Sequence, residues 1–90
     1  MFKAQETKGE SVEERDIIGV LAAFQTRSVR PIAFHWGLKK YRVDKVNLAY
    51  RRRDGGRLYY HFAVTSGPGT YDLCFDSATL EWRLWRAPEG

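Results

Sequence analysis

Cysteine is almost absent from this chain of 90 residues, in which Cys74 is the only one. A lone thiol forms no intrachain disulfide and no multi-cysteine metal site, which excludes the disulfide-stapled secreted domain and the zinc ribbon. Long apolar runs are also missing, and the N-terminal residues are rich in Lys, Glu and Gln. We therefore expect neither a membrane span nor an export signal, and we expect a cytoplasmic protein.

Motifs for metal binding and catalysis are missing as well. His35, His61 and Cys74 lack the closely paired spacing of zinc ligands. Cys74 would act as a nucleophile only beside a base held by a third group, and His61 is the one nearby candidate for that base. Gly67-Pro68-Gly69 lacks the helix and the Lys-Ser/Thr pair of a phosphate loop, so it predicts a turn. We expect no metal, no cofactor and no enzymatic activity.

Apolar and charged residues are both plentiful, at 43% hydrophobic, 14% aromatic and 29% charged. This apolar content is enough for one modest core, and the chain is too short for two. Residues 1–15 are polar and lack periodicity, which predicts a loosely held tail. Residues 16–87 predict a single β domain.

The segment that follows this tail fits two patterns. Ile17, Leu21 and Phe24 recur at helical spacing behind Ser11 and Glu14, which have the spacing of a capping box. Against a helix, a glycine lies in mid-segment, and β-branched residues cluster at the start of an apolar alternation. We favour a strand.

From Pro31 onward, apolar and polar residues alternate, and turn-forming residues separate the runs at short, even spacing. This pattern predicts antiparallel strands. In the long strand that begins at Lys39, the apolar parity changes near Asp44 and Lys45, which predicts a β-bulge there. Asp54-Gly55-Gly56 predicts a tight hairpin turn.

The fold class that follows is mainly β. We expect a small antiparallel meander of five to six strands, bent or curled into a partly open barrel, with a polar N-terminal tail. The side chains that the alternation turns inward are Ile32, Phe34, Trp36, Tyr41, Val43, Val46, Leu48, Tyr50, Leu58, Tyr60, Phe62, Val64, Tyr71, Leu73, Phe75, Leu80, Trp82 and Leu84. Those that it turns outward are His35, Arg42, Lys45, Asn47, Arg51, Arg53, Tyr59, His61, Thr65, Asp72, Cys74, Glu81, Arg83 and Trp85.

Positive charge is concentrated in the middle of the chain. Residues 27–57 hold ten basic and two acidic residues, a net of +8, whereas the flanking segments carry −2 each. A field of this kind attracts polyanions, although it also keeps a protein soluble.

The outward set therefore suggests a nucleic-acid interface. Arginines and lysine would track phosphates while exposed rings stack on bases. The residues of this hypothetical site are Arg42, Lys45, Arg51, Arg53, Arg57, Tyr59 and Trp85. The same pattern also fits a solvent-exposed sheet surface, on which the charged side chains keep the protein soluble and prevent the strand edges from pairing with other chains.

The alternative hypothesis is a protein-interaction or homodimerisation module with no role in nucleic-acid binding. It would use an exposed strand edge and an apolar patch made by Trp85 with the outward Ile17 and Leu21. The competing interpretation of Trp85 is that the polar tail, or the residues after Arg86, folds over it.

Four stretches carry a resemblance to known sequences. Arg30-Pro31-Ile32-Ala33-Phe34-His35-Trp36-Gly37 precedes Tyr41-x-Val43, and residues 71–76 and 79–84 complete the pattern. From Arg30 to Arg86 the chain resembles short bacterial proteins of unknown function that share Pro-x-x-Phe-x-Trp, Tyr-x-Val and Trp-x-Leu segments. The resemblance implies a β-rich fold and a bacterial origin, and it carries no catalytic residues.

Overall fold

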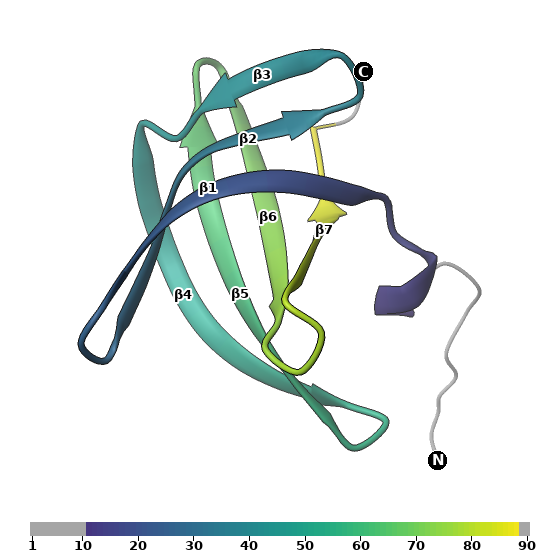
Figure 1. Cartoon of the computed structure of the whole chain (residues 1–90). Coiled ribbons are helices and arrows are strands. Elements are labelled where there is room, and N and C mark those ends of the chain that lie inside the picture. Colours follow the sequence, from purple (N-terminus) through teal and green to yellow (C-terminus); the bar gives the residue numbers. More distant parts are fainter. Residues whose placement is uncertain (1–10, 89–90) are drawn as a thin grey trace.

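The computed structural model describes residues 11–88 and is almost entirely β-structure (Figure 1). One turn of 3₁₀ helix, η2 (Val12–Glu14), precedes the strands. The seven strands are β1 (Ile17–Gln25), β2 (Ser28–Trp36), β3 (Lys39–Arg42), β4 (Lys45–Asp54), β5 (Arg57–Ser66), β6 (Gly69–Asp76) and β7 (Glu81–Arg86). The preference for a strand over a helix after the tail is thus confirmed by β1.

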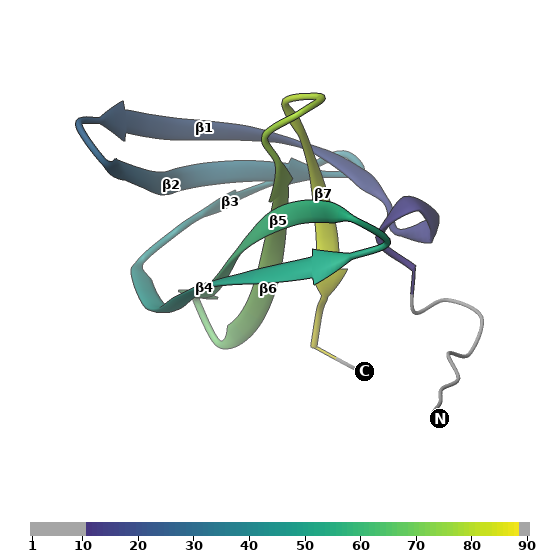
Figure 2. The ribbon, with the colours of Figure 1, turned by 90° about the horizontal axis from the view of Figure 1, so that it is seen from below.

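All neighbouring strands are antiparallel, in the order β3-β2-β1-β7-β6-β5-β4. Two meanders, β1 to β3 and β4 to β7, are joined where Ile17 and Ile18 of β1 pair with Arg83 and Trp82 of β7. Beyond this junction β1 and β2 cross over the curved sheet of β4 to β7, as the two views show (Figure 1, Figure 2). The result is a curled half-barrel.

The strand count exceeds the predicted five to six because the long strand expected from Lys39 is really two strands. β3 and β4 lie at opposite edges of the sheet, and Val43 and Asp44 join them. The Val43 amide donates to the Ile32 carbonyl across a distance of 2.9 Å, and the Asp44 amide donates to the Thr65 carbonyl across 2.8 Å. The parity change that predicted a bulge near Asp44 and Lys45 therefore marks a change of strand.

A bulge does occur slightly later, where the register of β4 against β5 shifts between Val46 and Leu48. Val46 lies opposite the buried Val64, but Leu48 lies opposite Ala63 and is 57% exposed. The prediction that Leu48 and Tyr50 point inward is wrong for this reason. Arg51, predicted to point outward, instead pairs with Tyr60 on the inner face.

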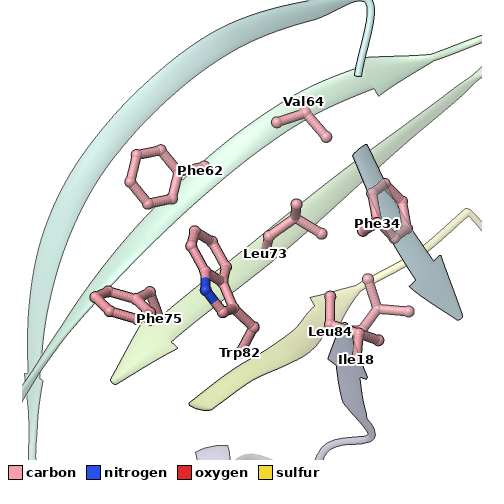
Figure 3. Packing of buried hydrophobic residues seen from close by; sticks show 8 residues of the cluster. All are labelled: Ile18, Phe34, Phe62, Val64, Leu73, Phe75, Trp82 and Leu84. Atoms are coloured by element: carbon pink, nitrogen blue, oxygen red, sulfur yellow. The ribbon is translucent and has the colours of Figure 1, made fainter. Parts of the chain in front are cut away.

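The main core fills the space between the β1–β2 layer and the strands β5 to β7 (Figure 3). Phe34 and Leu73 are fully buried at its centre. The ring of Phe75 packs on that of Trp82 with centroids 4.8 Å apart, and Phe34 stacks on Tyr41 at the same centroid distance. The core residues are Ile18, Phe34, Phe62, Val64, Leu73, Phe75, Trp82 and Leu84.

The hairpin turns follow from residues that tolerate left-handed backbone. Gly55 and Gly56, with φ of 61° and 85°, connect Asp54 to Arg57 and confirm the predicted turn. Leu80, at the end of the loop after Asp76, has a positive φ of 66° without being a glycine. It is 72% exposed, so its predicted inward position is wrong.

The outward face of the sheet is buried over part of its area. Tyr59, Cys74 and Trp85 form a second cluster with Val12, and all four side chains are buried. Val12 reaches this cluster from η2. At the start of η2 the Ser11 hydroxyl accepts a hydrogen bond from the Glu13 amide. Val12 and Arg15 of the predicted tail therefore contact the sheet, whereas residues 1–10 of that tail lie outside the described residues.

Within residues 11–88 there is no helix that combines the length and the apolar character needed to cross a membrane.

The two leucines that the alternation treated alike differ in burial and provide a stability test. Leu73→Ala should lower the free energy of unfolding by about 2–5 kcal/mol, because it leaves a cavity in the main core. Leu48→Ala should change it by less than about 0.5 kcal/mol, because that side chain lies in solvent. Urea denaturation measures both, and similar losses for the two variants would contradict the observed register.

Candidate functional site

A groove of about 650 Å³ opens between the far end of the β1–β2 hairpin and the strands β4 and β5. Its lining is mainly apolar and aromatic. Six of the residues that line it are Phe24, Val29, Ala49, Arg51, Tyr60 and Phe62. It borders the predicted basic strand, and its lining includes one of the predicted cations, Arg51.

The path of β1 creates this groove. β1 pairs with β7 only at Ile17 and Ile18, so its remaining residues follow β2 away from the curved sheet. A register shift after Leu21 bends the hairpin further. Phe24, near the hairpin end, meets the Phe75 ring of the core edge to face, with centroids 5.8 Å apart, and stays 60% exposed.

Two arginines contribute to the lining from opposite sides. Arg27 lies in the β1–β2 turn, and Arg51 lies on β4 opposite Tyr60. Within residues 11–88 neither guanidinium forms an ion pair with a carboxylate. The groove thus combines an exposed aromatic ring with two arginines whose charge no described acidic residue neutralises.

Unpaired backbone also borders the groove. β4 is an edge strand, so the side turned away from β5 has no strand neighbour among residues 11–88. β3 pairs with β2 only from Ala33 to Trp36, which leaves residues 28–31 without a strand on that side. Ser28 and Val29 of this stretch belong to the groove lining.

The structure does not bring the predicted nucleic-acid residues into one stripe. Arg51 and Arg53 share the inner face of β4, whereas Arg42 and Lys45 are exposed beside the partners Ala33 and Thr65 near the strand change. Arg57 is neutralised, because its Nη2 lies 3.0 Å from Asp76 Oδ2 and its Nη1 lies 3.6 Å from Glu13 Oε2.

The two rings predicted to stack on bases are not accessible. Tyr59 and Trp85 are 3% and 2% exposed, so the exposed positions predicted for them are wrong. The prediction of an apolar patch around Trp85 for dimerisation is wrong for the same reason, because the Trp85 side chain is buried. Ile17 and Leu21 do remain exposed. The competing interpretation, in which the chain covers Trp85, is the one observed.

Sequence reasoning missed Phe24, Arg27 and Tyr60 as groove residues. Thr26 and Arg27 form the turn between β1 and β2, and Arg27 adopts a φ of 62° without the glycine that usually signals such a turn. The alternation on both sides of Arg27 was the only signal of this hairpin. The alternation predicted correctly that Tyr60 lies on the inner face, but it did not predict that Tyr60 lines the groove.

The side chains of three arginines cover the ring of Trp85. The guanidinium carbons of Arg15, Arg52 and Arg86 lie 4.6, 5.0 and 5.5 Å from its ring centroid. The ring of His61 meets Trp85 edge to face, with centroids 5.6 Å apart at 85°. These contacts account for the burial of an indole on the outward face.

His61 is fully buried beneath this layer and belongs to a hydrogen-bonded chain. Its Nδ1 lies 2.9 Å from Asp72 Oδ1, and the Tyr50 hydroxyl donates to Asp72 Oδ2 across 2.9 Å. The rings of Tyr50 and His61 stack with centroids 4.8 Å apart and planes 14° apart. His61 Nε2 is buried without a hydrogen-bond partner among the described residues.

Cys74 lies opposite His61 in the β5–β6 ladder, so this face holds a thiol, an imidazole and an orienting carboxylate. However, Cys74 is also buried, and burial, aided by the charge of Asp72, raises the pKa of its thiol to about 12. Burial and the hydrogen bond to Asp72 likewise raise the pKa of the Tyr50 hydroxyl to about 12. The arrangement keeps Cys74 protonated and closed to a substrate.

Residues 11–88 contain no group of three His, Cys, Asp or Glu side chains placed to hold a metal ion.

Comparison of the chain with protein-family models, with curated proteins and with solved structures finds no match.

The burial of Cys74 and Tyr50 leads to a prediction about alkaline pH. The Cys74 thiol and the Tyr50 hydroxyl each have a higher pKa in the folded protein than in the unfolded chain, so the folded protein holds these protons more tightly. Their contribution to stability is therefore complete below about pH 8.5 and declines as pH rises towards 12. Urea denaturation from pH 8 to 11 should show this decline, and Cys74→Ala and Tyr50→Phe should each reduce it.

In the native protein Cys74 should resist a thiol reagent at pH 8 until denaturant is added. Rapid labelling of the native thiol would contradict the buried position.

Proposed function

We propose that this protein is a binding module for single-stranded nucleic acid and that the groove between the β1–β2 hairpin and β4 is its binding site. The observation that carries the proposal is the exposed Phe24 ring in an apolar groove lined on opposite sides by Arg27 and Arg51. Single strands are bound without strong sequence preference by aromatic faces that stack on bases and cations that follow the phosphates.

The apolar lining supports the base-stacking step. Phe24 offers ring surface to solvent, and Tyr60 contributes a second, partly exposed ring from β5. A base in a single strand has free π-faces, whereas a duplex keeps those faces stacked inside. The groove therefore suits unpaired nucleotides.

The charge distribution supports the phosphate step. Arg51 and Arg53 follow one another on the inner face of β4, and Arg27 lies across the groove on the hairpin. All three belong to the central segment with a net charge of +8. Such a segment speeds association with a polyanion and makes the affinity depend on salt.

A second candidate, the protein-interaction module, is favoured by the unpaired backbone of β4 and of residues 28–31. An extended peptide adds to such an edge through main-chain hydrogen bonds, and acidic side chains would suit Arg27 and Arg51. Binding of an acidic peptide without binding of oligonucleotides would favour this candidate over ours.

Phe24 and Leu21 form a matched pair for testing the stacking step, since both lie on β1 and are 60% and 62% exposed. Phe24→Ala should weaken binding of a short oligothymidylate by about 1–3 kcal/mol, the usual contribution of one stacked ring. Leu21→Ala should leave the affinity unchanged, because Leu21 lies away from the groove. Fluorescence anisotropy measures both, and equal effects would overturn the assignment of the groove.

Arg51 and Arg42 provide the corresponding test of charge. The affinity for the oligonucleotide should fall with salt at a log–log slope of about −0.7 for each neutralised phosphate. Arg51→Ala should reduce that slope by about 0.7, whereas Arg42→Ala removes the same charge outside the groove and should change the slope less. Binding that is absent at low ionic strength would eliminate the proposed function.

A further inference from the structure

We infer that the groove recognises the Watson–Crick edge of an unpaired base through main-chain groups of Val29, Ala49 and Arg51. This inference rests on the proposed function, because it names the part of the nucleotide that the same groove selects. Its basis is the strand register on the two sides of the groove, which fixes the direction of each main-chain N–H and C=O.

On one side of the groove, β4 points main-chain groups away from its neighbour β5. Asp54 and Arg57 close the β4–β5 hairpin with only two residues between them, so they exchange both main-chain hydrogen bonds. Hydrogen-bonded and non-hydrogen-bonded pairs alternate from there, and every second residue of β4 therefore directs its N–H and C=O outward. These residues are Arg53, Arg51 and Ala49, on the side where β4 has no strand neighbour within residues 11–88.

The same alternation applies to β2 on the other side. Gln25 and Ser28 close the β1–β2 hairpin across a two-residue turn, so Val29 is the first residue of β2 whose N–H and C=O point away from β1. Pro31 is the next, and a proline is tolerated at such an edge position because it has no N–H to pair. Since β3 pairs with β2 only from Ala33 to Trp36, no strand within residues 11–88 covers Val29.

The groove therefore has an unpaired strand edge on each side. Val29, Ala49 and Arg51 all belong to its lining, and β2 lies between β1 and β4, with its free edge on the side of β4 (Figure 2). Within residues 11–88 no hydrogen bond satisfies the outward main-chain groups of these three residues. A ligand that enters this hollow can form hydrogen bonds with them only if it both donates and accepts.

A nucleobase carries the matching groups on its Watson–Crick edge. Each of the four bases has a hydrogen-bond donor beside an acceptor on that edge, such as N3–H and O4 in thymine. One outward strand residue offers an acceptor and a donor on the same side, so it can pair with this edge whichever base presents it. The groove would then require an unpaired base without selecting one base, because a duplex keeps the same edge engaged. Phe24 and Arg51 supply the stacking surface and the charge for the same nucleotides.

An oligothymidylate that carries a methyl group on N3 of every thymine tests edge recognition separately from stacking and charge. The methyl group removes the N3–H donor and leaves the π-faces and the phosphates in place. By fluorescence anisotropy at low ionic strength, this oligonucleotide should bind at least about fivefold more weakly than plain oligothymidylate. Equal affinities would overturn the inference and leave the proposed function standing. Binding of neither oligonucleotide would overturn both, also if an acidic peptide binds in their place.

Ala49→Pro tests the main chain directly, since the Ala49 N–H points away from β5 and its loss leaves the ladder intact. Ala49→Ser keeps this N–H with a side chain of similar size and is the matched control. The affinity for plain oligothymidylate should fall at least about threefold in Ala49→Pro and change less than about twofold in Ala49→Ser. Unchanged affinity in a folded Ala49→Pro would overturn the inference. If circular dichroism shows that Ala49→Pro does not fold, the methylated oligonucleotide alone decides the outcome.

Discussion

The architecture depends on the short pairing between β1 and β7. Ile18 and Trp82, which face each other there, are both members of the main core, so one contact joins the two meanders and helps to seal the space between them. Because the pairing ends after Ile18, the rest of β1 is free to cross the curved sheet with β2. The core and the groove therefore both lie between the β1–β2 layer and the curved sheet, with the groove towards the far end of the hairpin.

Two irregularities then decide which side chains enter the groove. At the shift between Leu21 and Ala22 the extra residue is Ile32 of β2, which turns Val29 to the inner face opposite Phe24, whereas Phe24 keeps the inward parity of Ile18 on β1. The shift after Val46 turns Arg51 to the inner face of β4. A single extra residue in a strand reverses the face of every residue beyond it in that strand. Val29 and Arg51 both line the groove because one such reversal occurs on β2 and another on β4.

The opposite face of the sheet has a different role. His61, Asp72 and Tyr50 link three successive strands, and cations from Arg15, Arg52 and Arg86 close over Trp85 above them. A buried polar chain of this kind specifies one strand arrangement only while each hydrogen bond is made.

Alternation along the chain was enough to predict antiparallel strands, the inner positions of Phe34, Phe62 and Leu73, and the turn at Gly55-Gly56, because these features depend on residues close in sequence. The sequence alone also located the basic segment to which Arg27 and Arg51 belong. Only the tertiary structure decided that Trp85 is covered, that Leu48 is exposed, and that Phe24 lies across a groove from β4. The physical reason is that alternation shows which residues share a face, whereas burial of that face depends on segments distant in sequence that pack against it.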